Sequence, residues 1–284
     1  MPAKGALIVP RCLTIAGSDS GGGTGIQADL KAFAAAGCHG MSAIVALTAQ
    51  NTVGISAVHE PPSEFVRAQL EAVFDDIGVD AAKTGMLFSR ELIRTVAGYL
   101  VDHPVPLVVD PVMVASSGAE LLKGDAVDAL VIELFPLATV VTPNWHEAQA
   151  LAGHGGGTVP RTRAELAEAI VDLGASAVVV TGGHGDEPVD HLYDGERHVE
   201  IPVPRHDIPA THGAGCTHSA TLAALIAHGL SLEEAARGAA DAAGRAVRNG
   251  LMEIGAGEGP VDVLNVKERH EDLARRDAAD AARA

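Results

Sequence analysis

Aromatic residues and positive charge are scarce in this chain of 284 residues. Aromatic side chains make up 3% of it, which excludes the stacking platform on which single-stranded nucleic acids bind. Only 20 Lys and Arg residues stand against 37 Asp and Glu, a net charge of −17. Broad binding to nucleic acid or to an anionic membrane needs basic patches. We therefore expect neither as a partner.

Cysteine and long apolar runs are also scarce. The three cysteines, Cys12, Cys38 and Cys216, show no metal-type pairing. Such an odd, sparse set is typical of reduced thiols and not of a disulfide framework. No apolar run is long enough to span a bilayer, and the first eleven residues lack the apolar segment of a signal peptide. These features predict a cytoplasmic protein.

What the chain has instead is an alternation of apolar strands and helices. Strands are predicted at 13–16, 41–48, 55–59, 81–84, 106–109, 138–142, 177–181, 190–193 and 197–201, the last two joined by an Asp-Gly turn. Helices are predicted at 26–36, 63–76, 89–100, 125–134, from 147, and at 163–173, 218–228 and 232–248. The alternation predicts a mostly parallel sheet between two helical layers, with a small β-hairpin. Such sheets bind ligands at the carboxyl ends of their strands.

The domain organisation follows from the same pass along the chain. We find no internal repeat and no convincing linker, which predicts a single domain over residues 11–265 after an N-terminal extension, 1–10. Residues 266–284 form a charged, Ala-rich tail. Apart from Leu273, residues 267–284 show no apolar stripe. We expect this tail to be a frayed helix or disordered.

The stretch 211–219 is the clearest candidate site. It is a turn of small residues running into a helix, so several backbone N–H groups have no intrahelical partner and can bind an anion. At that place Cys216 should have a lowered thiol pKa and can be a base or a nucleophile; the alternative is a buried, inert cysteine. His212 and His218 suggest zinc, but the chain has no second ligand cluster. Residues 217–228 contain no arginine that could close a phosphatase loop.

A glycine-rich loop, 21–25, follows the first predicted strand. It lacks the Lys of a phosphate loop, and the acidic residue expected about 20 residues after a dinucleotide fingerprint is missing. We interpret it as a loop that lets a ligand approach its backbone; the alternative is a tight turn for packing. Asp29, in the helix that follows, is a candidate acceptor for a polar ligand or a solvent-facing carboxylate at a helix start.

Asp110 ends an apolar strand, and Asn144 and Glu147 follow another. Carboxylates at strand ends suit Mg²⁺, which binds through one or two of them together with phosphates. Taken alone, Asn144 and Glu147 equally fit a helix capping box. Both interpretations remain open at this point.

Taken together, these stretches resemble the hydroxymethylpyrimidine/phosphomethylpyrimidine kinases, ribokinase-like proteins of thiamine biosynthesis. The likeness spans residues 11 to 260 and is carried by 16–29, 49–52, 83–87, 110–112, 142–147, 182–184 and 211–216. It implies a ribokinase-like three-layer α/β/α fold and a homodimer. It further implies an ATP- and Mg²⁺-dependent kinase. The substrate would be 4-amino-5-hydroxymethyl-2-methylpyrimidine, and then its monophosphate, which yields the diphosphate.

The resemblance also implies a role for each matching residue. The pyrimidine site would be lined by Gly17, Thr24, Asp29, Gln50, Met86 and Val112. Gly213, Ala214, Gly215 and Cys216 would form the anion hole, with Cys216 as the base for the substrate hydroxyl. Asn144, Thr181 and Gly183 would bind the nucleotide, and Asp110 and Glu147 the metal. Two departures stand out: Thr24 replaces an expected Ala, and Thr181 replaces a common Lys.

Two other functions remain open. A pyridoxine or pyridoxal kinase is the nearest, because its substrate resembles the pyrimidine in its ring and its hydroxymethyl group. A non-catalytic pyrimidine-binding protein would keep the fold, but intact Asp110, Glu147 and Cys216 argue against it. A cysteine hydrolase is a more distant third.

Overall fold

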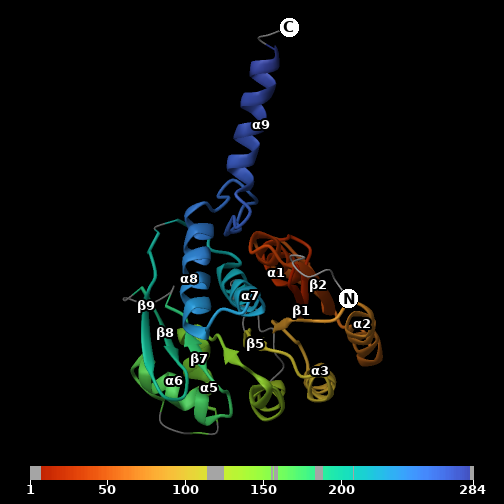
Figure 1. Ribbon diagram of the computed structural model, residues 1–284, viewed down its shortest axis with the longest axis vertical. Coiled ribbons are helices and arrows are strands. Elements are labelled where there is room, and N and C mark those ends of the chain that lie inside the picture. Colours follow the sequence, from red (N-terminus) through yellow and green to blue (C-terminus); the bar gives the residue numbers. More distant parts are fainter. Residues whose placement is uncertain are drawn as a thin grey trace.

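A computed structural model describes residues 8–113, 125–154, 156, 159–182, 188–206 and 208–281 (Figure 1). These residues form a nine-stranded sheet in the order β3-β2-β1-β4-β5-β6-β7-β8-β9. Strands β2, β1, β4, β5, β6 and β7 run parallel, and β3, β8 and β9 add antiparallel pairs at the two edges. Their bounds are β1 (Arg11–Asp19), β2 (His39–Gln50), β3 (Ile55–His59), β4 (Ala81–Thr84), β5 (Leu107–Val109), β6 (Val140–Val141), β7 (Val178–Val180), β8 (Val189–Tyr193) and β9 (His198–Pro202).

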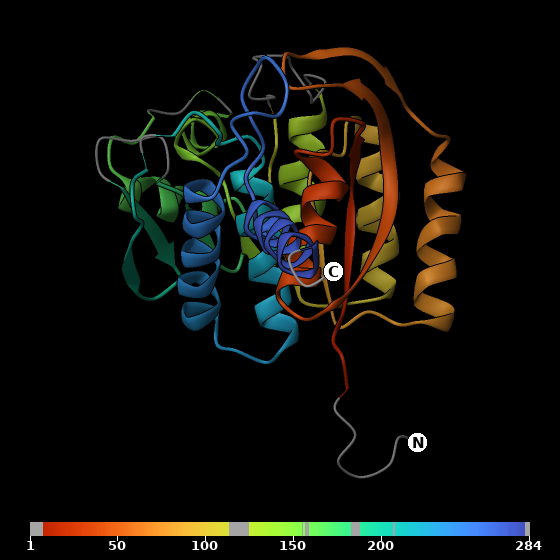
Figure 2. The same ribbon diagram turned by 90° about the horizontal axis from the view of Figure 1, so that it is seen from above.

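Helices cover both faces of the sheet (Figures 1 and 2). One face carries α1 (Gly25–Ala35), α7 (Ala214–Ala227) and α8 (Leu232–Arg248). The other carries α2 (Ser63–Asp76), α3 (Arg90–Asp102), α4 (Ala126–Ala129), α5 (Trp145–Ala152) and α6 (Arg163–Asp172). The expected three-layer arrangement is therefore confirmed.

The central strands are buried on both faces, which explains their unbroken Val runs. In β7, Val178 and Val180 belong to the apolar cluster under α6, while Val179 belongs to the cluster under α7 and α8. Successive side chains of a strand point to opposite faces, so a strand between two helical layers is apolar throughout. This packing fixes the strand ends that carry the site.

Two predicted helix boundaries were wrong. The helix expected from residue 218 begins at Ala214, because Gly213 adopts the left-handed conformation (φ +90°) that starts α7 there. Cys216 consequently lies within the first turn. The helix expected over 125–134 is α-helical only to Ala129; it continues as a π-helical turn, η1 (Leu130–Leu134), and a 3₁₀ turn, η2 (Phe135–Leu137). Pro136 lacks the N–H that a continuing helix would need.

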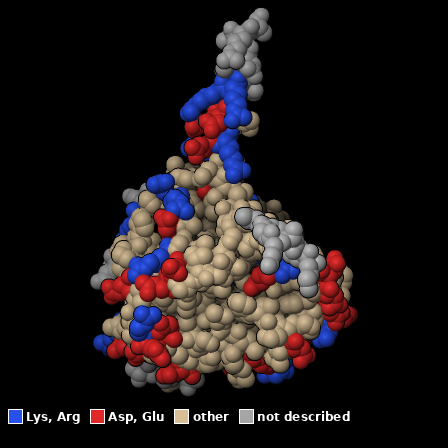
Figure 3. Space-filling model, in the orientation of Figure 1, with Lys and Arg blue, Asp and Glu red and all other residues tan. Residues whose placement is uncertain are grey.

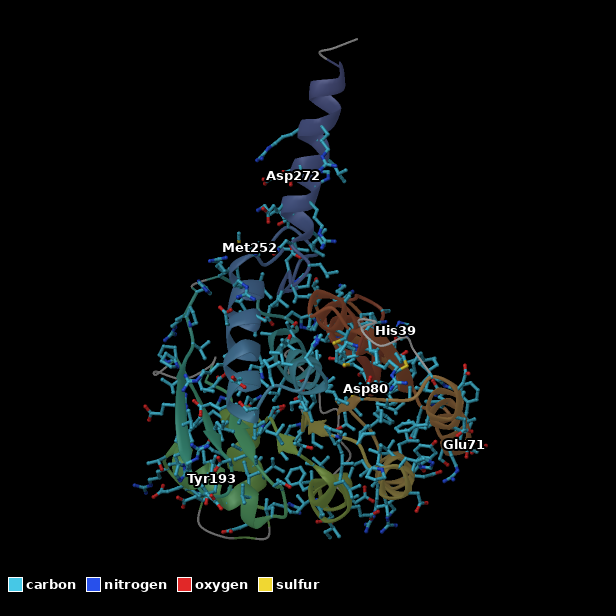
Figure 4. All side chains as sticks on the ribbon, in the orientation of Figure 1. His39, Glu71, Asp80, Tyr193, Met252 and Asp272 are labelled. Carbon is cyan, nitrogen blue, oxygen red and sulfur yellow. The ribbon has the colours of Figure 1, made fainter. Side chains whose placement is uncertain are left out.

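The last helix, α9 (Val266–Ala281), stands away from the rest of the chain (Figure 1). Acidic and basic side chains share its surface in Figure 3, and Asp272 lies on its free length, whereas Met252 lies near its base (Figure 4). A helix that is polar all round is not held by an apolar stripe. None of the helices described is long and apolar enough to cross a membrane.

Candidate active site

A cavity of about 910 Å³ opens at the carboxyl ends of β1, β4, β5 and β7. Its wall contains most of the residues expected in the site, from both helical layers. They are Gly17, Thr24, Gln50, Met86, Asp110, Val112, Asn144, Glu147, Thr181, Gly213, Ala214, Gly215 and Cys216. Asp29 is not in the wall, and Gly183 lies outside the described residues. The fold thus brings segments from the whole domain to one space.

The glycine loop is organised by Asp19, at the end of β1. Its carboxylate accepts hydrogen bonds from the backbone N–H groups of Gly21, Gly23 and Thr24, at 2.8 to 2.9 Å. Burial disfavours the charged carboxylate, but these donors and His212 outweigh it and lower the pKa of Asp19 to about 2. The ionised side chain therefore shapes the loop at every physiological pH.

Thr24 and Gln50 form one end of the cavity. The Thr24 hydroxyl donates to Asp19 (3.1 Å) and accepts from the Gln50 amide (3.4 Å), whose oxygen in turn accepts from Thr48 (3.1 Å). The extra hydroxyl of Thr24 thus fixes the Gln50 amide. A methyl group on Gly17 would overlap Met86 Cε, so Gly17 is the residue that lets Met86 enter the wall.

The start of α7 packs directly against the glycine loop. A methyl group on Gly213 would overlap the carbonyl oxygen of Gly23, and one on Gly23 would overlap the His212 ring. The His212 Nε2 atom also lies 3.7 Å from Asp19. The first turn of α7 has N–H groups without an intrahelical partner, which suits an anion at this place. The glycine loop and the first turn of α7 therefore form one packed unit.

Cys216 is half-buried in the first turn of α7, at the cavity wall. The expectation of a lowered pKa was wrong for the ligand-free site, because burial raises the pKa of the thiol to about 12. Asp29 and Asp110 add to this increase. Lys83 and the backbone N–H of Gly25 oppose it, since both favour a thiolate. A helix start alone does not compensate for desolvation.

Asp29 lies beneath the cavity wall, fully buried. Its two oxygens lie 3.0 and 3.1 Å from the Lys83 ammonium, and one of them accepts from Thr14 at 2.6 Å. The carboxylate is thus engaged by protein groups on both oxygens. This placement does not match the expected direct contact with a ligand, nor the alternative of a solvent-facing carboxylate.

Asp110 and Glu147 occupy the other end of the cavity. Asp110 accepts from the Ser219 hydroxyl at 2.8 Å. The capping box is present: Asn144 Oδ1 accepts from the backbone of His146 and Glu147, and Glu147 accepts from the Asn144 N–H, all at 2.9 Å. Burial and the charge of Asp110 raise the pKa of Glu147 to about 8. The helix cap therefore also holds a carboxylate that a bound cation would stabilise.

The raised pKa of Glu147 predicts how the free energy of unfolding of the protein without bound metal depends on pH. Between about pH 5 and 8 the unfolded Glu147 is ionised, whereas the folded one keeps its proton. Glu147 therefore makes the free energy of unfolding fall as pH rises through this window. We expect Glu147→Gln to flatten that slope in urea titrations with a chelator present. Equal slopes for the two proteins would contradict the prediction.

A more apolar part of the wall lies between β8, β9 and α8, where it is lined by Pro188, Val203, Ile208, Ala240, Ala243 and Val247. Next to it lies His218, buried, with neither ring nitrogen hydrogen-bonded to the described residues. Its Nε2 atom is 3.2 Å from Asp190, whose other oxygen accepts from the Gly182 N–H at 2.7 Å. Thr181, at the end of β7, completes this part.

Sequence reasoning assigned no role to Lys83 or Asp19, and it weighed His218 only as a zinc ligand or a partner of Cys216. A lysine in the otherwise apolar strand β4 and an aspartate at the end of β1 were available signals. His218 gave none beyond its place near Cys216, because its neighbour Asp190 is 28 residues away in the sequence. Only the tertiary structure, which sets His218 of α7 beside Asp190 of β8, joins the two.

Comparison with known proteins gives a consistent result. A family model described as phosphomethylpyrimidine kinase matches residues 19–262. The hydroxymethylpyrimidine/phosphomethylpyrimidine kinase of Rhizobium meliloti is 49% identical over 252 residues, 88% of this chain and 95% of that protein. Among solved structures, an ADP complex of Bacillus subtilis pyridoxal kinase has a TM-score of 0.82 at 38% identity, covering 92% of this chain and 99% of its own. A phosphomethylpyrimidine kinase of Clostridium difficile has a TM-score of 0.71 at 40% identity, covering 81% of this chain and 96% of its own.

Proposed function

The chain belongs to the phosphomethylpyrimidine kinase family, and on that premise we propose that it is an ATP-dependent kinase of thiamine biosynthesis. It phosphorylates 4-amino-5-hydroxymethyl-2-methylpyrimidine and then the monophosphate. The observation that carries this function is a single cavity that holds Gln50 and Met86 at one end, Asp110 and Glu147 at the other, and Cys216 on the first turn of α7. Phosphoryl transfer needs mainly such positioning and charge stabilisation.

In the reaction, the oxygen of the substrate hydroxymethyl group attacks the γ-phosphorus of ATP, and the bond from that phosphorus to the β,γ-bridging oxygen breaks, which releases ADP. The hydroxyl proton passes to Sγ of Cys216 in its thiolate form, the form that Lys83 and the Gly25 N–H stabilise, which gives the thiol. The N–H groups at Gly213, Ala214, Gly215 and Cys216 stabilise the charge on the transferred group. Thr24, Gln50, Met86, Val112 and Gly17 surround the ring, with the Gln50 amide as its hydrogen-bonding partner. Asn144, Thr181 and Gly183 bind the nucleotide.

Mg²⁺ fits the donor set of this site. Asp110 and Glu147 would hold it, as two hard oxygen donors that the phosphates and water complete. No group of three or more His, Cys, Asp or Glu suited to a metal occurs among the described residues. When bound, the ion supplies positive charge to the phosphates and removes the repulsion between the two carboxylates.

An ATP-coupled assay with the pyrimidine and its monophosphate, tested separately, is the direct test. We expect turnover of both, and strict dependence on Mg²⁺. If neither substrate supports ATP turnover although the pyrimidine binds, a non-catalytic role would be favoured. Turnover of the monophosphate alone would restrict the function to the second step.

Pyridoxal kinase activity is the second candidate, because the pyridoxal kinase from B. subtilis shares this fold closely. The whole cavity, of about 910 Å³, has room for either heterocycle beside the nucleotide. Steady-state rates with pyridoxal in the same assay separate the two. A kcat/KM for pyridoxal tenfold or more above that for the pyrimidine would make pyridoxal kinase the better assignment.

We further propose that residues 11–265 are the catalytic domain and that the enzyme is a cytoplasmic homodimer. Leu47 on β2 and Val58 on its partner, the edge strand β3, are 46% and 37% exposed, and Val53 between the two strands is 67% exposed. Apolar side chains gathered on a strand pair are common at subunit contacts. Light scattering measures the molecular mass in solution directly, and the mass of a monomer would contradict the proposed homodimer.

A further inference from the structure

His218 is a buried histidine of α7 that no step of the proposed reaction uses. Its side chain is 5% exposed, and the residue is part of the cavity wall. Neither ring nitrogen has a hydrogen bond to the described residues. Buried polar side chains are nearly always satisfied, so this one needs an explanation. The charged group beside it is Asp190 of β8, whose Oδ2 atom lies 3.2 Å from His218 Nε2.

Asp190 connects this contact to the turn that follows β7, residues 181–182, which we call the nucleotide turn. The aspartate is 3% exposed, and its Oδ1 atom accepts from the Gly182 N–H at 2.7 Å. A methyl group on Gly182 would overlap the backbone of Val189, so the turn lies directly on the start of β8. Thr181 lies in the cavity wall. A polar chain therefore runs from His218 through Asp190 to the nucleotide turn.

The other end of this chain lies in the helix that carries the proposed anion hole. His218 comes two residues after Cys216 in α7, and its neighbour Ser219 donates to Asp110 at 2.8 Å. Successive residues of α7 thus make polar contacts with groups on two different strands or their ends, Asp110 after β5 and Asp190 in β8. Apolar packing is non-directional, whereas such contacts hold particular atoms at particular distances. They therefore fix where the start of α7 lies relative to both.

In the proposed function, one ATP molecule has to reach both places. Its transferred phosphoryl group lies at the first turn of α7, and other parts of the nucleotide lie at the nucleotide turn. The spacing of these two places decides whether the γ-phosphorus meets the attacking hydroxyl. A misplacement of about 1 Å can cost about 10²-fold in rate.

We propose that His218 is a positioning residue of the kinase: through Asp190 it holds the nucleotide turn at a fixed distance from the anion hole. The inference rests on the proposed ATP-dependent function. It adds to that function a link between the two parts of the site, made by a side chain that need not touch the nucleotide. His218 and Asp190 act as one unit.

Three variants and a matched control test this link. His218→Phe keeps a planar ring and removes both nitrogens, whereas His218→Gln keeps a group that can donate to Asp190. Asp190→Asn keeps an oxygen that can accept from Gly182 and removes the charge that faces His218. The control is His191→Phe, which removes a buried histidine from the same strand. His191 Nε2 lies 2.9 Å from His198 Nδ1, and neither histidine belongs to the cavity wall.

The readout is the calorimetric Kd, with Mg²⁺ present, for ADP and for a non-hydrolysable ATP analogue. We expect His218→Phe to weaken the analogue about tenfold and ADP about twofold or less, because only the triphosphate reaches from the nucleotide turn to the anion hole. His218→Gln should restore most of the difference, and His191→Phe should change neither Kd. Equal losses for the two nucleotides, or no loss in a folded His218→Phe protein, would overturn the proposal, since His218 would then only fill space.

Thermal unfolding shows whether each variant folds. If His218→Phe does not, Asp190→Asn takes its place, and the same selective loss of the analogue is expected because the contact between the two side chains is broken. A folded Asp190→Asn protein with an unchanged ratio of the two Kd values contradicts the link equally well.

The kinase assay keeps this inference apart from the proposed function. We expect kcat with the pyrimidine to fall by about tenfold in His218→Phe, with little change in KM for the pyrimidine. A wild-type protein that binds neither nucleotide would remove the proposed function and this inference with it. A wild-type protein that binds both and turns over the pyrimidine, beside a His218→Phe protein with the same two Kd values, contradicts the role of His218 alone.

Discussion

Replacing Cys216 by Ala is expected to lower kcat for the pyrimidine by about 10²- to 10⁴-fold, and to lower it less for the monophosphate, which has no hydroxymethyl proton to lose. The thiol sits on the first turn of α7 at the cavity wall, where the proton of the substrate hydroxyl must leave. Alanine keeps the backbone N–H groups of the anion hole and removes only the acceptor atom. KM for ATP should therefore change little. Steady-state kinetics with each substrate measure the effect.

Two comparisons make this prediction specific. Cys38→Ala removes a buried cysteine at the amino-terminal end of β2, away from the cavity, and should leave turnover unchanged. Cys216→Asp supplies a carboxylate base at the same position, and we expect it to retain more activity than Cys216→Ala. A Cys216→Ala enzyme with normal turnover and an intact fold would contradict the assignment of the base. It would then have to be sought among Asp110 and the other acidic groups of the cavity.

The second large effect is expected for Gly213→Ala. Gly213 has φ +90°, in the left-handed region, and an added methyl group would overlap the carbonyl oxygen of Gly23. The strained backbone costs about 1–3 kcal/mol. Relief of the overlap must separate the glycine loop from the start of α7, which misplaces the anion hole. Loss of donors there costs about 10²- to 10³-fold each in kcat.

Gly229→Ala is the matched control for this substitution. Gly229 follows the other end of α7, with φ +85° and no heavy atom within 4 Å of an added methyl group. It therefore carries the same backbone strain without the overlap, and far from the cavity. We expect it to lose stability but to keep kcat, whereas Gly213→Ala loses both. Equal kinetic losses in the two variants would show that the contact with Gly23 does not shape the anion hole.

The family, the ribokinase-like fold and the kinase function could all be predicted from the sequence, and the comparisons confirm them. All nine strands were predicted, because apolar runs bounded by Gly, Pro and Asp are local signals. The roles of individual site residues remain predictions. The start of α7 was misplaced because Gly213 to Gly215 resembles a turn until the left-handed Gly213 is seen to open the helix.

The sequence by itself therefore determined what is encoded locally: the elements, their order and the motifs at the strand ends. The tertiary structure decided the electrostatics of the site. It buried Asp29 on Lys83, raised the pKa of Cys216 where the helix start alone predicted a lower one, and set Asp110 against Glu147. Desolvation and charge–charge distances depend on groups far apart in the chain, and no local pattern contains them.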